Sequence, residues 1–201
     1  DSATTTRSLP YAFGTAGAVT LTDNTTFSSG TGAITLFDVT AANWNLVLQG
    51  SGVDVLGVVN LGTGTLNLAG KTGGSVTVNG LVTAGALTTV GNNYGIVLNG
   101  GGTVTAAVSF LNTGGLTIDP SGFVFTGGAS KVTGTKSFAG TISSTNAALN
   151  FGTAGAITLT AATTFSSGTG AITLFDVTAV NFDLVLQGSG ADVLGVVNLG
   201  T

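Results

Sequence analysis

Short runs in which apolar and polar residues alternate recur along the whole chain, separated by turns rich in glycine. The segments 19–22, 34–36, 76–79 and 116–119 each alternate Val, Ile or Leu with Thr, Asn or Asp. A period of two is typical of a β-strand with one buried face. The intervening clusters, such as SSGTG, GKTGG and GNNYG, contain the residues that tolerate turn conformations. The pattern predicts many short strands and almost no helix.

The turns follow one another at a steady spacing. The strands LVLQG and LNLAG end at Gly50 and Gly70, and VTVNG and IVLNG end at Gly80 and Gly100. This spacing predicts an all-β fold, a parallel β-helix with coils of ~20–22 residues, aliphatic side chains inside and Thr and Asn outside. Asn79 and Asn99 are expected to stack at a turn. Sandwich domains of ~100 residues and a membrane barrel of ~10-residue tilted strands do not explain the spacing.

A much longer repeat overlies this pattern, because residues 13–63 return as residues 151–201 at a constant offset. The seven differences are Val19/Ile157, Asp23/Ala161, Asn24/Ala162, Ala42/Val180, Trp44/Phe182, Asn45/Asp183 and Val53/Ala191. Most of them keep the apolar or polar character of the site, as a packed interior requires. We therefore expect the two copies to share one backbone.

The repeat divides the chain into three parts. Residues 1–12 form a non-repeating N-terminal segment, residues 13–150 the first unit, and residues 151–201 a partial second unit. We expect the three parts to make one continuous solenoid. Because the second copy stops within its unit, we also expect either a longer array or subunits that stack end to end.

The composition narrows the possible functions. Glycine supplies 34 residues, only 6% of residues are charged, and four Lys and Arg face eight Asp, for a net charge of −4. So few basic residues cannot form a positive stripe for nucleic acid. The absence of Cys and His excludes disulfides and sites built from thiolate or imidazole. No apolar run approaches the ~18 residues of a membrane-spanning helix, which predicts a chain that is not transmembrane.

One motif suggests a metal. The sequence QGSGVDVLG at 49–57, repeated as QGSGADVLG at 187–195, resembles a calcium-binding nonapeptide in which Asp54 and Asp192 would be ligands. The segment that follows the first copy, VVNLGTGTL, does not continue the motif, so a second half-site is missing. This favours a β-turn with an exposed Asp. Calcium is the one cofactor that the sequence suggests, and we otherwise predict none.

A catalytic interpretation rests on carboxylates. Asp38 and Asp176 precede Asp54 and Asp192 at the same spacing in the two copies, and two carboxylates on adjacent strands could act as an acid/base pair, as in β-helices that cleave polysaccharides. Such sites need a basic residue to stabilise charge, and the only arginine, Arg7, lies outside the repeat. Outward, solvated carboxylates that discourage lateral aggregation explain the same residues. We predict that the chain is not an enzyme and has no catalytic residues.

Aromatic side chains could provide a surface for sugars. Trp44, Phe182, Phe37 and Phe175 occupy matching positions of the two copies. Because Trp44 is replaced by Phe182, a packing role is favoured over a sugar-stacking platform.

Segments such as GAITLTAATTFSSGTGAITL and LVLQGSG resemble the passenger regions of repetitive bacterial surface adhesins, namely filamentous-haemagglutinin-like exoproteins and autotransporter passengers. The resemblance covers residues 13–201 and is one of style, with Gly, Thr, Asn and aliphatic residues in ~20-residue coils. It implies a right-handed β-helix, export to the cell surface, and a role in adhesion or fibre formation. No functional residue of that family can be transferred, because no position matches a binding motif.

Together these observations predict a structural segment of an extracellular filament or stalk on a bacterial cell surface, which gives length and stiffness and supports adhesion or biofilm formation. The predicted partner is another copy, stacked end to end, because an open solenoid end leaves strand edges unpaired. Two alternatives share the fold, namely an adhesin that binds a glycan or matrix surface and an enzyme that cleaves polysaccharides.

Overall fold

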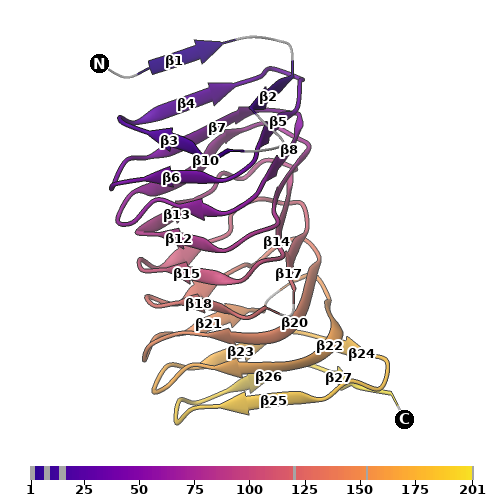
Figure 1. Cartoon of the computed structure of the whole chain (residues 1–201). Helices are drawn as coiled ribbons and strands as arrows, with labels where there is room; N and C mark the ends of the chain where they lie inside the picture. Colours follow the sequence, from indigo (N-terminus) through magenta and orange to yellow (C-terminus); the bar gives the residue numbers. More distant parts are fainter. Residues whose placement is uncertain (1–2, 7–9, 14–16, 120, 153, 201) are drawn as a thin grey trace.

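The computed structural model describes residues 3–6, 10–13, 17–119, 121–152 and 154–200. Within these ranges every regular element is a β-strand and every pairing between strands is parallel. The chain winds into a rod with its N- and C-termini at opposite ends (Figure 1). The structure confirms the predicted all-β class and the parallel β-helix.

Each coil contributes one strand to each of three faces, in the order first, second, third. The first face contains β1 (Ala3–Thr6), β4 (Thr25–Ser28), β7 (Leu46–Gly50), β10 (Thr65–Lys71), β13 (Ala86–Thr88), β16 (Val108–Ser109), β19 (Ala129–Ser130), β21 (Leu149–Phe151), β23 (Ile172–Leu174) and β26 (Val193–Leu194). Its ladder is interrupted between β13 and β16. There the Thr89 hydroxyl donates to the Ser109 carbonyl at 2.8 Å and accepts from the Leu111 amide at 2.8 Å, which bridges the gap.

The second face is an unbroken ladder. It contains β2 (Tyr11–Phe13), β5 (Ile34–Leu36), β8 (Val53–Leu56), β11 (Ser75–Val78), β14 (Gly95–Leu98), β17 (Leu116–Ile118), the first parts of β20 (Lys136–Ser143) and β22 (Ile157–Ser166), β24 (Val177–Ala179) and β27 (Val197–Asn198). In neighbouring coils Thr35 pairs with Val55, and Val55 pairs with Thr77. These pairings confirm the predicted coil length.

The third face completes each coil. It contains β3 (Val19–Leu21), β6 (Val39–Ala41), β9 (Val59–Asn60), β12 (Val82–Ala84), β15 (Gly102–Val104), β18 (Phe123–Phe125), the second parts of β20 and β22, and β25 (Leu184–Gln187). The strands β20 and β22 therefore run around a corner, and the register between them shifts between Phe138 and Gly140.

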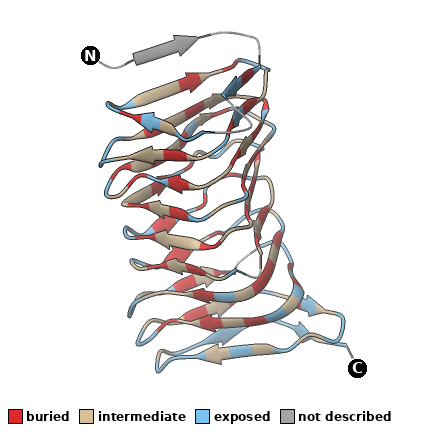
Figure 2. Ribbon diagram, in the orientation of Figure 1, coloured by how far each residue is buried: buried red, intermediate tan, exposed pale blue. Residues whose placement is uncertain are grey.

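The core is a column of apolar side chains inside the coils, which Figure 2 shows as buried segments along the rod. Leu48, Val78 and Leu98 are among the aliphatic members, and Phe138, Phe151 and Phe165 pack ring against ring near the C-terminal end. In strands such as β5, β11 and β17 a Thr alternates outward between buried aliphatic residues, as predicted. The expectation of an aliphatic interior is incomplete, because charged and polar side chains are also buried within the rod, among them Asp54, Asn112 and the lysines Lys71, Lys131 and Lys136.

The two copies of the long repeat form strands at most matching positions but lie on different faces. The expectation of one shared backbone is wrong at Asp23 and Asn24, which lie between β3 and β4, because their counterparts Ala161 and Ala162 lie within the continuous strand β22. Residues 19–21 lie on the third face, whereas their counterparts 157–159 lie on the second. Likewise Leu46–Gly50 lies on the first face and Leu184–Gln187 on the third. The repeat unit (13–150) therefore spans about six and two-thirds turns of the solenoid.

Candidate functional site

The calcium candidate Asp54 is buried at the centre of the rod, in strand β8. Its Oδ1 accepts a hydrogen bond from the Ile34 amide of the preceding coil at 2.9 Å, and its Oδ2 pairs with Lys71 Nζ of the following coil at 2.7 Å. Lys71 also donates to the Gly52 carbonyl at 2.9 Å. Burial raises the pKa of Asp54, and the Lys71 ammonium and the Ile34 amide oppose that shift. The expectation of an exposed Asp in a turn is wrong for Asp54, because the carboxylate links three successive coils.

This arrangement does not suit calcium, which takes six to eight oxygen ligands. Both oxygens of Asp54 already accept from N–H donors, and one donor carries a positive charge. In the described parts of the chain no group of three or more Asp, Glu, His or Cys side chains could hold a metal.

The second calcium candidate, Asp192, lies at the C-terminal end and is exposed. It repeats half of the arrangement at Asp54, because its Oδ1 accepts from the Ile172 amide at 2.9 Å. No lysine pairs with it among the described residues. The carboxylate of this motif therefore has both an amide and a lysine partner at Asp54, which is buried, and only an amide partner among the described residues at Asp192, which is exposed.

Asp38 and Asp176 also accept hydrogen bonds from backbone amides. Asp38 Oδ1 accepts from the Val58 amide at 2.7 Å, and Asp176 Oδ1 accepts from the Val196 amide at 3.1 Å. Both carboxylates are partly buried, so the expectation of fully solvated side chains is wrong. Each carboxylate accepts a hydrogen bond between coils that a backbone carbonyl would otherwise accept. Asp38 and Asp54 bind different amides, those of Val58 and Ile34. Arg7 lies outside the described residues.

Asparagines stabilise the turns in the same way. The Asn99 side chain donates to Asn79 Oδ1 at 2.9 Å, which confirms the predicted stack. A second short series involves Asn24, whose Oδ1 accepts from the Asn45 amide, and Asn45, whose Oδ1 accepts from the Thr65 amide. These contacts explain why Asn is common at the corners.

Sequence reasoning missed a polar cluster inside the rod. Lys131 donates to the Asn112 carbonyl at 2.6 Å, and Lys136 donates to the carbonyls of Ala154 at 2.7 Å and Gly155 at 2.9 Å. Burial, together with the charge of Lys136, lowers the pKa of Lys131 to about 8. Burial also lowers the pKa of Lys136. The sequence contained one sign of these buried lysines. Three of the chain's four basic residues, Lys71, Lys131 and Lys136, occur next to glycine-rich turns, whose carbonyl groups can accept hydrogen bonds from a lysine.

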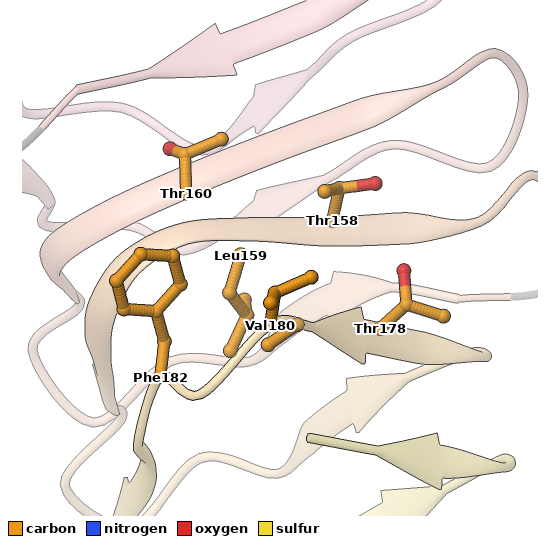
Figure 3. A pocket seen from close by; sticks show the side chains of 7 residues that line it. Thr158, Leu159, Thr160, Thr178, Val180 and Phe182 are labelled. Atoms are coloured by element: carbon orange, nitrogen blue, oxygen red, sulfur yellow. The ribbon is translucent and has the colours of Figure 1, made fainter. Parts of the chain in front are cut away.

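The aromatic candidates are all at least partly exposed, and in the described residues no stacked ring pair joins Phe37, Trp44, Phe175 and Phe182. Phe182 lines an open groove of about 300 Å³ together with Leu159, Val180 and Ala179 and the side chains of Thr158, Thr160 and Thr178 (Figure 3). The matching positions of the first copy carry Trp44 and Ala42 in place of Phe182 and Val180. These four candidates, Phe37, Trp44, Phe175 and Phe182, therefore lie on the outside of the rod rather than in the core.

The last coil leaves its interior uncovered. Leu194 and Val197 are 44% and 39% exposed, whereas their counterparts Leu56 and Val59 are fully buried. Figure 2 shows the strands β25, β26 and β27 as largely exposed or intermediate, in contrast to the middle of the rod. Among the described residues no further coil pairs with β25, β26 and β27.

No protein-family model, curated protein or solved structure matches this chain. The fold defines the class as a parallel β-solenoid and does not by itself assign a family. None of the elements in the described ranges is a helix of the length and apolar character that crossing a bilayer requires.

Proposed function

We propose that this chain is a structural segment of an extracellular filament or stalk on a bacterial surface, where it supplies length and stiffness and supports adhesion. Three observations support the proposal. The ladder of the second face runs without a break from β2 to β27. Asp38, Asp54, Asp176 and Asp192 each accept a hydrogen bond from a backbone amide of a neighbouring coil, which is a structural role. The repeated unit adds turns to the rod instead of forming a separate globule.

The observation that carries the proposal is the contrast between the two copies of one segment. Residues 46–60 are covered by the next coil, whereas residues 184–198 are open and have almost the same sequence. An open apolar coil with unpaired strand edges favours addition of another coil. We therefore propose that a further coil covers residues 184–198, supplied either by a longer array or by another copy stacked end to end.

Mechanical stiffness would follow from two features. Backbone hydrogen bonds join each coil to its neighbours along the rod, for example at Val97 with Thr77 and Thr117. Side-chain acceptors such as Asp54 and Asn79 continue these contacts at the corners. Because each coil contacts only its neighbours, length can increase without any change in the core.

The experiment is to determine the mass and shape of the purified chain by light scattering and electron microscopy over a range of concentrations. We expect rods whose length grows with concentration. Leu194→Asp, at the open end, should reduce this growth, whereas Leu81→Asp, at an exposed lateral position, should not. Circular dichroism checks that both variants keep the fold. A monodisperse monomer at every concentration contradicts the proposal of end-to-end association.

The groove beside Phe182 supports a second candidate function, an adhesin that binds a glycan. A ring next to several hydroxyl groups is a combination that suits a sugar, with the ring stacking on C–H groups and the hydroxyls donating and accepting. A glycan array with the chain and with Phe182→Ala tests this function. Retained binding to a glycan by the variant, or no binding by the parent chain, removes it.

A further inference from the structure

We propose that one water molecule is bound inside the rod between Lys131 and Asn112, where it accepts a hydrogen bond from Lys131 Nζ and donates one to Asn112 Oδ1. This inference goes beyond the proposed function, because it concerns the interior of the chain and holds whatever the rod does. The two residues follow β16 and β19, which pair in parallel, and they are 0% and 1% exposed. They therefore face each other across neighbouring coils at a buried corner.

The amide of Asn112 contains an acceptor without a donor. Its Nδ2 group donates to the carbonyl oxygens of Tyr94 at 2.9 Å and of Gly114 and Gly115 at 3.3 Å. Because carbonyl oxygens only accept, these three contacts fix the orientation of the amide and turn Oδ1 away from them. In the described residues Asn112 Oδ1 is the one buried side-chain oxygen or nitrogen that has no hydrogen-bond partner. Buried acceptors are as a rule satisfied, by protein or by ordered water.

Lys131 is the least satisfied of the three buried lysines. An ammonium group has three N–H donors. Among the described residues Lys136 Nζ contacts three carbonyl oxygens, and Lys71 Nζ contacts a carbonyl and a carboxylate. In the same ranges Lys131 Nζ donates only to the Asn112 carbonyl oxygen, at 2.6 Å. Two donors of Lys131 are therefore left beside the residue whose Oδ1 lacks one.

The chemistry of these groups defines the ligand, which must both donate and accept. An anion would bind the Lys131 ammonium but would be repelled by Asn112 Oδ1, and a cation would bind Oδ1 but would be repelled by the ammonium. Burial and the charge of Lys136 lower the pKa of Lys131, as expected for an ammonium without a carboxylate partner. Water has no net charge, two donors and two acceptors, and it commonly satisfies buried polar groups.

The first test is a crystal structure of the full chain at a resolution that shows ordered water, with bromide in place of chloride in the crystals. We expect density within ~2.7–3.2 Å of both Lys131 Nζ and Asn112 Oδ1, without an anomalous signal. An anomalous peak at this position would identify a halide and refute water as the ligand. The absence of density there, or a direct hydrogen bond from Lys131 Nζ to Asn112 Oδ1, would overturn the inference.

Nuclear magnetic resonance tests the same site in solution. We expect a nuclear Overhauser cross-peak between the water resonance and the Asn112 side-chain amide, with the sign of a long-lived bound water. Lys131→Met should abolish this cross-peak, because the water loses its donor. Lys136→Met is the matched control and should retain it, because Lys136 donates to other carbonyl groups.

Circular dichroism checks that both variants keep the fold. A cross-peak that is unchanged in Lys131→Met would show that other groups hold the water, and would overturn its assignment to Lys131. Equal loss in both variants would indicate general loosening of the core and would refute the specific pairing. If Lys131→Met does not fold, the crystal structure of the parent chain still decides the question.

Discussion

Thr178 lies in the same row of paired residues as Thr35, although its counterpart in the repeat is Thr40. The row passes from Thr35 through Val55 and Thr77 and on to Thr158 and Thr178, over seven turns. The repeat instead places the counterpart of Thr35 at Thr173, which precedes Thr178 and lies in β23 on the first face. The second copy therefore falls short of a whole number of turns, which places each of its strands on the preceding face.

This offset predicts the symmetry of an array built from the unit. A chain in which residues 13–150 are repeated in tandem should show a rise of ~32 Å per unit, from ~4.8 Å per coil, and a rotation of about a third of a turn. Cryo-electron microscopy of such an array measures both quantities. Three units, or ~96 Å, should separate identical features on one side of the rod. Units that superpose by translation alone would contradict this geometry.

The Asp54–Lys71 pair predicts a large loss of stability when only one partner is removed. Lys71→Met leaves the Asp54 carboxylate buried without its ammonium partner and should lower the free energy of unfolding by about 3–5 kcal/mol. Adding Asp54→Asn to Lys71→Met should recover much of the loss, because the amide keeps an acceptor for Ile34 and carries no charge.

Asp192→Asn is the matched control, because it changes the same position of the motif in the second copy. Among the described residues no lysine forms an ion pair with Asp192. It should change the free energy of unfolding by less than about 0.5 kcal/mol. Urea unfolding of the four proteins gives the comparison. Equal effects at both sites would show that burial of the pair is not what determines its contribution.

The buried lysines predict stability that rises with pH. The pKa of Lys131 is about 8 in the folded chain and returns to its ordinary value of 10.5 on unfolding. Between these values the unfolded chain binds more protons, so the free energy of unfolding should increase with pH, by about 3 kcal/mol in total. Below pH 8 this contribution should be constant. The raised pKa of Tyr94 opposes the trend only above pH 10, where tyrosine ionises in the unfolded chain.

Chemical denaturation at intervals between pH 7 and 10 measures this dependence. In Lys131→Met the rise should be smaller, and the remaining part should come from Lys136, whose pKa is also lowered. A profile that is identical in the parent chain and in Lys131→Met would assign the pH dependence to other groups.

The coil was predictable because the period of two and the ~20-residue spacing of turns are local signals. The Asn79–Asn99 stack followed from the same spacing. The burial of Asp54 could not be predicted, because its partners Ile34 and Lys71 lie in the preceding and following coils, far from it in the sequence. The rotation of the second copy was equally hidden, since it depends on the sum of coil lengths that vary between neighbours.

Close stacking of the coils predicts a contrast between two glycines. A Cβ at Gly85 would lie 2.6 Å from the carbonyl carbon of Thr63 in the preceding coil and nearer still to its oxygen, so Gly85→Ala must push two backbones apart. The cost should be about 1–3 kcal/mol of unfolding free energy. At Gly91 the nearest atom to a Cβ is the Leu111 carbonyl oxygen at 3.9 Å, so Gly91→Ala should be neutral or should stabilise the chain by up to about 1 kcal/mol. Thermal and urea unfolding of the two variants provide the measurement. A similar loss of stability in both would mean that the backbone freedom of glycine, rather than the contact between coils, explains why it is so frequent in this chain.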